Sequence, residues 1–423
     1  MKAALSLPVD DDRQDVRGPA VMPDAKDIDR LRTELLTVFL NRMNAGQVPY
    51  CLLSGYQDYP DAIASDVDFM VHPSDLGRVA PLLLEAARRC DALLVQAIRH
   101  ETGAWYFVMA KQSGCEVAYL HPDCSGDYRR KGRLWLEAQP VLETRQPYKA
   151  FFVPAIADEF LHYLIKKTLK QRITTSQWRR IAALYLISPQ ECGERMRRFW
   201  SDKTVKALEA ALLRHDTGWM RFHLPALLSE LRGSAAVEDW KSRVQQRLQE
   251  WRRWSERVVN PTGLSIAVCG GTRQQRRQLM EALETNLKPA FRRTAVRADE
   301  TTGNGAWDKA KVWLAKVRST LVIRTPALAK AAWLTQDEIV VVLVSENYQE
   351  ASDQRTVGDR RVWCALREGQ SLQTNVQQAT RFILEYLTQR LQRRMTLSDP
   401  SATMQQMHID TTQELAGGTR SAP

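Results

Sequence analysis

Two aspartates, placed two residues apart, are the side chains of this chain that most clearly suggest chemistry. Asp66 and Asp68 open the apolar run Phe69-Met70-Val71. Because side chains alternate along a β-strand, both carboxylates are expected to point to the same side of a sheet. Carboxylates placed in this way repel one another unless a divalent cation lies between them. The pair therefore predicts a site for Mg²⁺ or Mn²⁺ at the end of a strand.

A small turn precedes this strand. Gly55 stands eleven residues before Asp66, with Ser54 in front of it and Tyr56 behind it. Glycine lets backbone amides approach a phosphate closely, so the turn is a candidate phosphate site. The turn and the acidic strand together resemble the nucleotidyltransferase superfamily (DNA polymerase beta-like proteins), in which an hG[GS] turn precedes a D-h-D strand. Tyr56 departs from that pattern, because the family usually has glycine or serine there.

The resemblance implies roles for individual residues. Asp66 and Asp68 would hold Mg²⁺ against a nucleoside triphosphate, and Ser54, Gly55 and Ser65 would contact the nucleotide. An acceptor hydroxyl would then attack the α-phosphorus, and pyrophosphate would leave.

A third carboxylate on an adjacent strand normally completes a site of this kind. Glu116 lies inside an expected strand over residues 115–120, and Asp123 lies just beyond it. We expect Glu116 to complete the site, because a residue within the strand can project beside the two aspartates. As a metal ligand and general base it would take the proton of the acceptor hydroxyl. An exposed strand glutamate without a function is the alternative.

Length and composition set the class of protein. A chain of 423 residues is longer than a domain with a single hydrophobic core, so two or three domains are expected. No apolar run is long enough to span a membrane, and the acidic amino terminus lacks the apolar segment of a secretory signal. The seven cysteines are scattered without a C-x-x-C pair, which excludes a disulfide framework and a zinc site and is typical of a cytoplasmic protein.

The net charge of +11 comes mainly from residues 151–260. A basic surface attracts polyanions in general, including nucleic acid, nucleotides and anionic membranes. The basic residues here alternate with acids along helical patterns, which is typical of a solvated helix face. No nucleic-acid-binding motif is present, so nucleic acid is not expected as a partner.

The patterns predict an α/β multidomain protein with three folded blocks. Within the first block we expect helices over 27–44 and 74–90, the second capped by Ser74, and strands at 50–54, 66–71, 92–98, 105–110 and 115–120. The divisions are a disordered leader at 1–26, a nucleotidyltransferase-like mixed sheet at 27–150, a helical domain at 151–260, a parallel α/β domain resembling P-loop kinases at 261–395, and a disordered tail at 396–423.

The helical block carries two candidate site lysines. Lys166 and Lys170 follow apolar residues that recur at helical spacing from Phe160 to Leu169. Helical domains that follow a nucleotidyltransferase core commonly lend a lysine to the triphosphate, so the resemblance implies this role for both. Lysines that simply face the solvent are the alternative.

The third block begins with an apolar run, Leu264 to Cys269, that leads into Gly270-Gly271 and then a helix expected over 279–287. A strand, a glycine-rich loop and a helix are the layout of a P-loop, whose amides bind phosphate at a helix start. The block resembles the thymidylate kinase-like P-loop proteins of bacterial surface-polysaccharide gene clusters.

The phosphate-binding residues of that motif are missing. In the G-x-x-x-x-G-K-[ST] register from Gly270, the second glycine is Gln275, the lysine is Arg276 and the hydroxyl residue is Arg277. The strand over 320–323 is followed by Arg324, without the acid that such kinases carry. We therefore expect a fold that has lost phosphoryl transfer, in which Arg273, Arg276 and Arg277 retain at most non-catalytic anion binding.

Two functions from different classes follow. The first is a Mg²⁺-dependent transferase that moves a nucleotidyl group from an NTP to an unidentified acceptor hydroxyl, in bacterial exopolysaccharide synthesis with other assembly proteins. The second is a regulatory or scaffold protein built from two vestigial nucleotide-binding folds. A nucleic-acid-modifying transferase is a third class, for which the sequence contains no motif.

Overall fold

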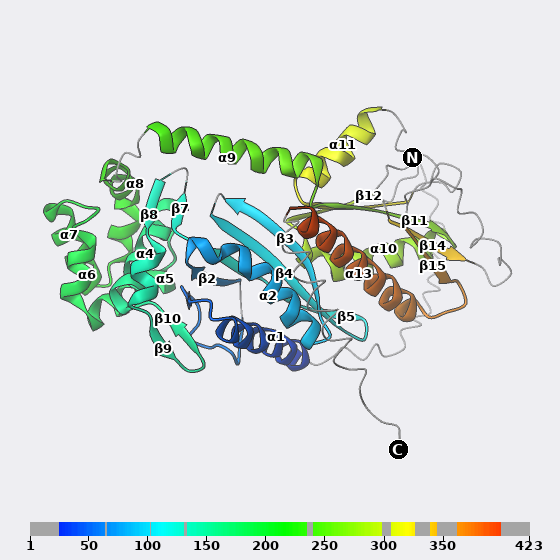
Figure 1. Ribbon diagram of the computed structural model, residues 1–423, viewed down its shortest axis with the longest axis horizontal. Helices are drawn as coiled ribbons and strands as arrows, with labels where there is room; N and C mark the ends of the chain where they lie inside the picture. The colour runs from blue at the N-terminus through cyan, green and yellow to red at the C-terminus, as the bar shows by residue number, and fades with distance from the viewer. Residues whose placement is uncertain are drawn as a thin grey trace, which may run out of the picture.

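The computed structural model describes residues 25–63, 66–101, 103–130, 133–234, 240–297, 306–325, 339–344 and 362–398. These form a mixed α/β protein in which an amino-terminal sheet lies between a helical cluster and an all-parallel sheet (Figure 1). None of the described helices is long and apolar enough to cross a bilayer. All seven cysteines are free thiols, as the sequence predicts.

The amino-terminal sheet has the strand order β1-β2-β6-β4-β3, with β5 paired to β4 beside β6. Its expected strands and helices are confirmed, and the sequence missed β6. The bounds are β1 Tyr50–Leu52, β2 Val67–Val71, β3 Leu93–Glu101, β4 Ala104–Ser113, β5 Glu116–Leu120, β6 Pro122–Ser125, α1 Ala25–Ala45 and α2 Leu76–Arg89.

The start of α2 differs from the prediction. Ser74 does not cap the helix, because it lies inside a short 3-10 turn, η1 Pro73–Asp75, that precedes α2. The His72 side chain accepts from the backbone amide of Ser74 instead. Asp75 occupies the cap position of α2 without a side-chain hydrogen bond.

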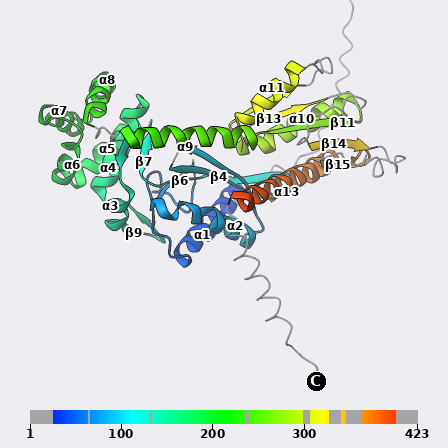
Figure 2. The ribbon, with the colours of Figure 1, turned by 45° about the horizontal axis from the view of Figure 1, so that its top comes forward.

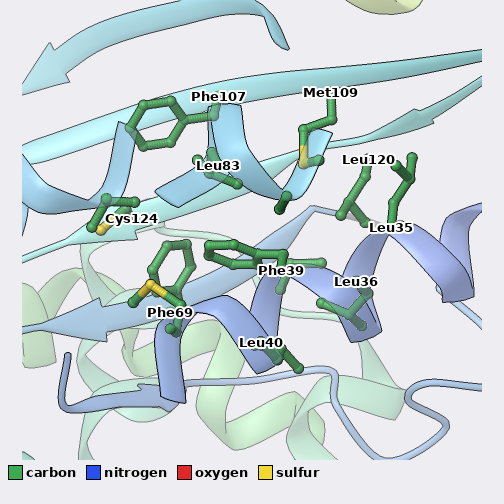
Figure 3. Close-up of a cluster of buried hydrophobic side chains, with 14 of the residues drawn as sticks. Leu35, Leu36, Phe39, Leu40, Phe69, Leu83, Phe107, Met109, Leu120 and Cys124 are labelled. Carbon is green, nitrogen blue, oxygen red and sulfur yellow. The ribbon is translucent and has the colours of Figure 1, made fainter. Parts of the chain in front are cut away.

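One face of this sheet packs on α1 and α2. Alternate residues of β2 and β4 point into this core, where Phe69 meets Phe39 edge to face with ring centroids 5.4 Å apart. Figure 3 shows Phe107 and Met109 of β4 over the same helices. Side chains alternate along β2, so Val67, Phe69 and Val71 face this core, whereas Asp68 and Met70 face the opposite side of the sheet. Asp68 can therefore line a site on that side.

A helical cluster follows the sheet and is organised around α4, which contacts three neighbouring helices. The sequence did not indicate α8, which has Pro225 in its interior. The helices are α3 Ala138–Glu143, α4 Ile156–Lys170, α5 Thr175–Ile187, α6 Pro189–Met196, α7 Asp202–Leu213, α8 Thr217–Ser234 and α9 Trp240–Val259. Two small hairpins accompany them, β7 Tyr128–Arg130 with β8 Arg133–Leu136 and β9 Gln146–Tyr148 with β10 Phe151–Val153.

The carboxy-terminal sheet is parallel throughout, with the order β12-β13-β11-β14-β15. Its central strands are buried on both faces, which explains their continuous apolar runs. The elements are β11 Leu264–Gly270, α10 Arg273–Leu287, η2 Lys288–Ala290, β12 Arg293–Arg297, α11 Ala306–Val317, β13 Thr320–Arg324, β14 Ile339–Val344, β15 Val362–Arg367 and α13 Leu372–Ser398. The leader and the tail beyond 398 lie outside the described residues.

The two sheets share a core. Val95, Val108 and Tyr119, on the second face of the amino-terminal sheet, belong to the same buried cluster as the inner sides of α10 and α13. The hydroxyl of Tyr119 donates to the carbonyl of Asn286 at 2.7 Å, and the buried amide of Gln96 donates to the carbonyl of Thr262 at 3.0 Å. Figure 2 shows α13 alongside the sheets at this junction.

The contact between β11 and β14 requires glycine at position 270. Its φ is +73°, and a Cβ there would lie 2.0 Å from the carbonyl oxygen of Leu343. Gly114 also has a positive φ, +59°, but no atom lies within 4 Å of such a Cβ.

We expect Gly114→Ala to lower the free energy of unfolding by about 1 kcal/mol, from backbone strain alone. Gly270→Ala should cost about 1–3 kcal/mol more, because β11 and β14 must separate. Urea unfolding followed by circular dichroism compares them, and equal losses would contradict this packing.

Candidate active site

Asp68 and Asp123 occupy neighbouring strands at one end of the amino-terminal sheet. β2 and β6 run parallel, and Asp68 is the direct register partner of Asp123. Asp66 precedes β2 on the same side as Asp68 by strand alternation. The backbone amide of Leu53 donates to the carbonyl of Asp68 at 2.9 Å, so the turn after β1 lies beside the acids. Three acidic residues and the Ser54-Gly55 turn therefore lie at the same end of the sheet.

Asp68 is neutralised by a lysine from the helical cluster. Lys166 Nζ, on α4, donates to Asp68 Oδ2 at 2.7 Å, and Ser54 Oγ donates to the same oxygen at 3.2 Å. Burial alone would raise the pKa of Asp68, but Lys166 and the hydrogen bonds lower it below its ordinary value. The structure thus brings together Asp68, Ser54 and Lys166, three residues that the sequence assigned to one site.

Among the described residues, no lysine or arginine forms an ion pair with Asp123. Burial, with the nearby charges of Asp68 and Asp66, raises the pKa of Asp123 to about 7. The ring of His100 lies 3.6 Å from it, Nε2 to Oδ1, but burial and two nearby arginines lower the pKa of that imidazole to about 4. The histidine is therefore neutral near physiological pH and does not offset the carboxylate.

A tyrosine of β4 forms a hydrogen bond with Asp66. The hydroxyl of Tyr106 donates to Asp66 Oδ1 at 3.2 Å, and the His121 ring lies 3.9 Å from the same oxygen. Burial and the charge of Asp66 raise the pKa of Tyr106, so the phenol stays protonated and acts as a donor. The side chain of Asp66 is about half exposed, which leaves one side of the cluster open to solvent.

Buried ion pairs at the start of α4 fix the position of Lys166. Tyr56, 4% exposed, donates its hydroxyl to Glu159, and Arg180 donates to the other oxygen of Glu159 at 2.8 Å. Arg195 pairs with the adjacent Asp158 at 3.0 Å. Tyr56 directly follows the Ser54-Gly55 turn, so it ties that turn to the helix carrying the lysine. Its ring is buried against Tyr148 and Phe151.

Two further residues of α4 face the acids. Lys170 is exposed one turn beyond Lys166, and burial and Lys166 lower its pKa while Asp68 and Asp123 act in the opposite direction. No hydrogen bond from Lys170 to an acid of the cluster is formed among the described residues. His162 is 1% exposed, and burial with Lys166 lowers its pKa to about 3, so a neutral imidazole lies behind Asp68.

Glu116 is not part of this cluster, which corrects the expectation from the sequence. On β4, Glu116 pairs with Ser113, whereas Asp123 pairs with Tyr106, seven residues away along the strand. That separation corresponds to about 23 Å at the strand rise. Asp123, the weaker candidate from the sequence, is the acid next to Asp68. Ser65 lies outside the described residues.

The acids match a divalent cation in type but are not gathered as a ligand set. Mg²⁺ and Mn²⁺ prefer carboxylate oxygens, and the pKa of Asp123 is raised first by burial and then by the charges of Asp68 and Asp66. Within the described parts of the chain, however, no three His, Cys, Asp or Glu side chains converge as a metal-holding group. Lys166 supplies the positive charge beside Asp68.

The glycine turn of the carboxy-terminal sheet is closed. The helix begins at Arg273, six residues earlier than expected, because Thr272 and Gln275 form a reciprocal capping box. Arg276 Nη1 donates to the carbonyls of Gly270 and Gly271 at 3.1 and 2.8 Å. Arg277 pairs with Glu281 at 2.9 Å. The side chains of Arg276 and Arg277 are thus engaged within the chain.

The sequence favoured Glu116 over Asp123 for a local reason. Pro122 begins β6, and a proline without an amide hydrogen argues against a strand in a sequence pattern. It is tolerated here as the first residue of a short strand. The alternation Asp123-Cys124-Ser125, with Cys124 buried, is the only signal that could have indicated this strand.

Comparison of the chain with protein-family models, with curated proteins and with solved structures found no match. The resemblances to nucleotidyltransferases and P-loop kinases therefore stay predictions made from motifs. The arrangement of the acids, the lysine and the turn carries the functional argument.

The raised pKa of Asp123 predicts a pH-dependent effect of Asp123→Asn in chelator-treated protein. Between pH 4 and 7 the folded state keeps a proton that the unfolded state loses, so the wild type loses stability as pH rises. Asparagine has no such proton. The gain in Tm of the variant should grow from pH 5 to pH 8, reaching about 2 °C or more. Differential scanning fluorimetry measures it, with Glu116→Gln as the control. A gain that does not change with pH would contradict the assignment.

Proposed function

We propose that this chain is a nucleotidyltransferase that uses Mg²⁺ or Mn²⁺ and an NTP. The observation that carries the proposal is the register of Asp68 with Asp123, at the point where Lys166 and the Ser54-Gly55 turn also meet. Acids, a small turn and a lysine come from separate parts of the chain, and a purely structural role would not require all of them at one sheet end.

Asp66, Asp68 and Asp123 would hold the metal, which when bound would offset the charge of the triphosphate. Gly55 has a φ of +75°, and a Cβ at this position would have no atom within 4 Å, so the turn leaves room for a phosphate. Lys166 and the exposed Lys170 would face the phosphates. Asp123, in place of Glu116, would accept the proton of the acceptor hydroxyl.

The carboxy-terminal module is proposed to be catalytically inactive. Its glycine turn holds Arg276 instead of a phosphate, and Gln275 is committed to the helix cap. Arg324 ends β13 where an acid would be needed. A cytoplasmic role in surface-polysaccharide assembly, with an unidentified acceptor and partner proteins, is suggested only by resemblance to proteins of such gene clusters.

A non-catalytic scaffold is the second candidate. It is favoured by the ion pair between Lys166 and Asp68, which neutralises the aspartate without a metal, and by the lack of a converged ligand set among the described residues. In a scaffold, the acids and the lysine would form a structural link between the sheet and α4. Metal-dependent nucleotide binding distinguishes the two candidates.

A thermal-shift screen against the four NTPs, with and without Mg²⁺ or Mn²⁺, tests the transferase. A nucleotide present at a hundredfold excess over its Kd should stabilise the protein by about 2.7 kcal/mol. Asp68→Asn and Asp123→Asn should each abolish the metal-dependent part of the shift. Glu116→Gln is the matched control, because this acid lies at the far end of β4 and should leave the shift intact.

Two outcomes would reject the transferase. If no nucleotide stabilises the wild type with either metal, the scaffold is the better description. If Glu116→Gln removes the shift as completely as Asp123→Asn does, the acids have been assigned wrongly.

Arg276→Ala tests which of the two sheets binds the nucleotide. The substitution removes two charged hydrogen bonds to the glycine turn and should cost about 1–3 kcal/mol of stability. The nucleotide-induced shift should stay at the wild-type value, because the proposed site lies on the other sheet. Isothermal titration with the NTP found in the screen measures this, and a loss of binding would place the nucleotide on the carboxy-terminal sheet instead.

A further inference from the structure

Helix α9 contacts the amino-terminal sheet through its polar side. Arg253 donates to the carbonyl of His100, and Arg257 donates to the carbonyl of Arg99 at 2.9 Å, so both arginines bind the end of β3. Figures 1 and 2 show α9 as a long helix that runs from the helical cluster towards the carboxy-terminal sheet. These two guanidinium groups attach α9 to β3.

The apolar side of α9 is exposed. Val244, Leu248, Trp251 and Trp254 recur at helical spacing, and their exposed fractions are 47%, 65%, 73% and 58%. At about 100° per residue, Trp251 lies about 160° around the helix from Arg253. The indole rings of Trp251 and Trp254 pack edge to face, with centroids 6.3 Å apart. An amphipathic helix normally buries its apolar side, and this one presents it to the solvent.

The exposed side is also basic. Apart from Arg253 and Arg257, which bind β3, α9 contains four arginine or lysine residues and two glutamates. Arg247 is exposed among the apolar residues, and Arg252 is exposed at their border, where it pairs with Glu256 at 3.4 Å. The chain as a whole carries a net charge of +11. A binding partner of this side must contact indole rings and arginines together.

We propose that α9 binds the surface of an anionic phospholipid bilayer. A helix with tryptophans on one side and arginines beside them lies in the interfacial plane, where indole rings prefer the headgroup level and arginines bind lipid phosphates. A second copy of the chain fits less well, because the same arginines would face one another. The helix lies on the membrane and does not cross it, in agreement with the lack of a spanning helix among the described residues.

Sedimentation of the full chain with vesicles tests the proposal. Phosphatidylcholine vesicles should bind weakly, and added phosphatidylserine should increase binding in a salt-sensitive manner. Trp251→Ser with Trp254→Ser should weaken binding at least about tenfold. Trp313→Ser on α11, where the indole is 40% exposed, is the matched control and should bind as the wild type does. Arg247→Glu with Arg252→Glu should remove the preference for phosphatidylserine.

Several results would overturn the proposal. One is a wild type that does not bind phosphatidylserine vesicles. Another is a double tryptophan variant that binds them fully. A dimer in light scattering that dissociates in the same variant would show that a second copy covers the helix. A large fall in Tm of the variant would show that the indoles are buried within the chain itself, since exposed side chains should leave Tm nearly unchanged.

Discussion

Repulsion among three carboxylates at one sheet end is the constraint on which the rest of the structure depends. Asp68 and Asp123 are in direct register, and Asp66 is at the start of the same strand. Asp68 and Asp66 receive hydrogen bonds from two different elements. Lys166 on α4 serves Asp68, and Tyr106 on β4 serves Asp66. The helical cluster must therefore dock where its lysine reaches β2.

That docking is set by buried charges. Glu159 and Asp158 in the first turn of α4 are almost fully buried, and both are paired with arginines of the same cluster. Buried pairs add little net stability, but breaking one is costly, so they favour one orientation of the helix over others. Their position at a helix amino terminus is also favourable for negative charge. Tyr56 transmits this orientation to the turn beside Asp68.

Local sequence patterns predicted most helices and strands. Contacts between residues distant in sequence determined which acids lie together in the candidate site. The helices and strands of the first block follow from apolar periodicity. Helical spacing predicted the helix that carries Lys166, and the family resemblance implied the role of this lysine. The choice between Glu116 and Asp123 depended on a strand that starts with proline and on a parallel register that no local pattern encodes. Gln275 and Arg276 were recognised as departures from a P-loop, but the capping box and the closed turn became visible only in three dimensions.

The core shared by the two sheets has a consequence for cooperativity. Leu391 and Met395, near the end of α13, pack against the core under α1 and α2, while the same helix covers the carboxy-terminal strands. Removing the carboxy-terminal module would expose apolar surface of the sheet that carries the acids. The two modules therefore form one folding unit, in which the carboxy-terminal module permanently covers apolar surface of its neighbour.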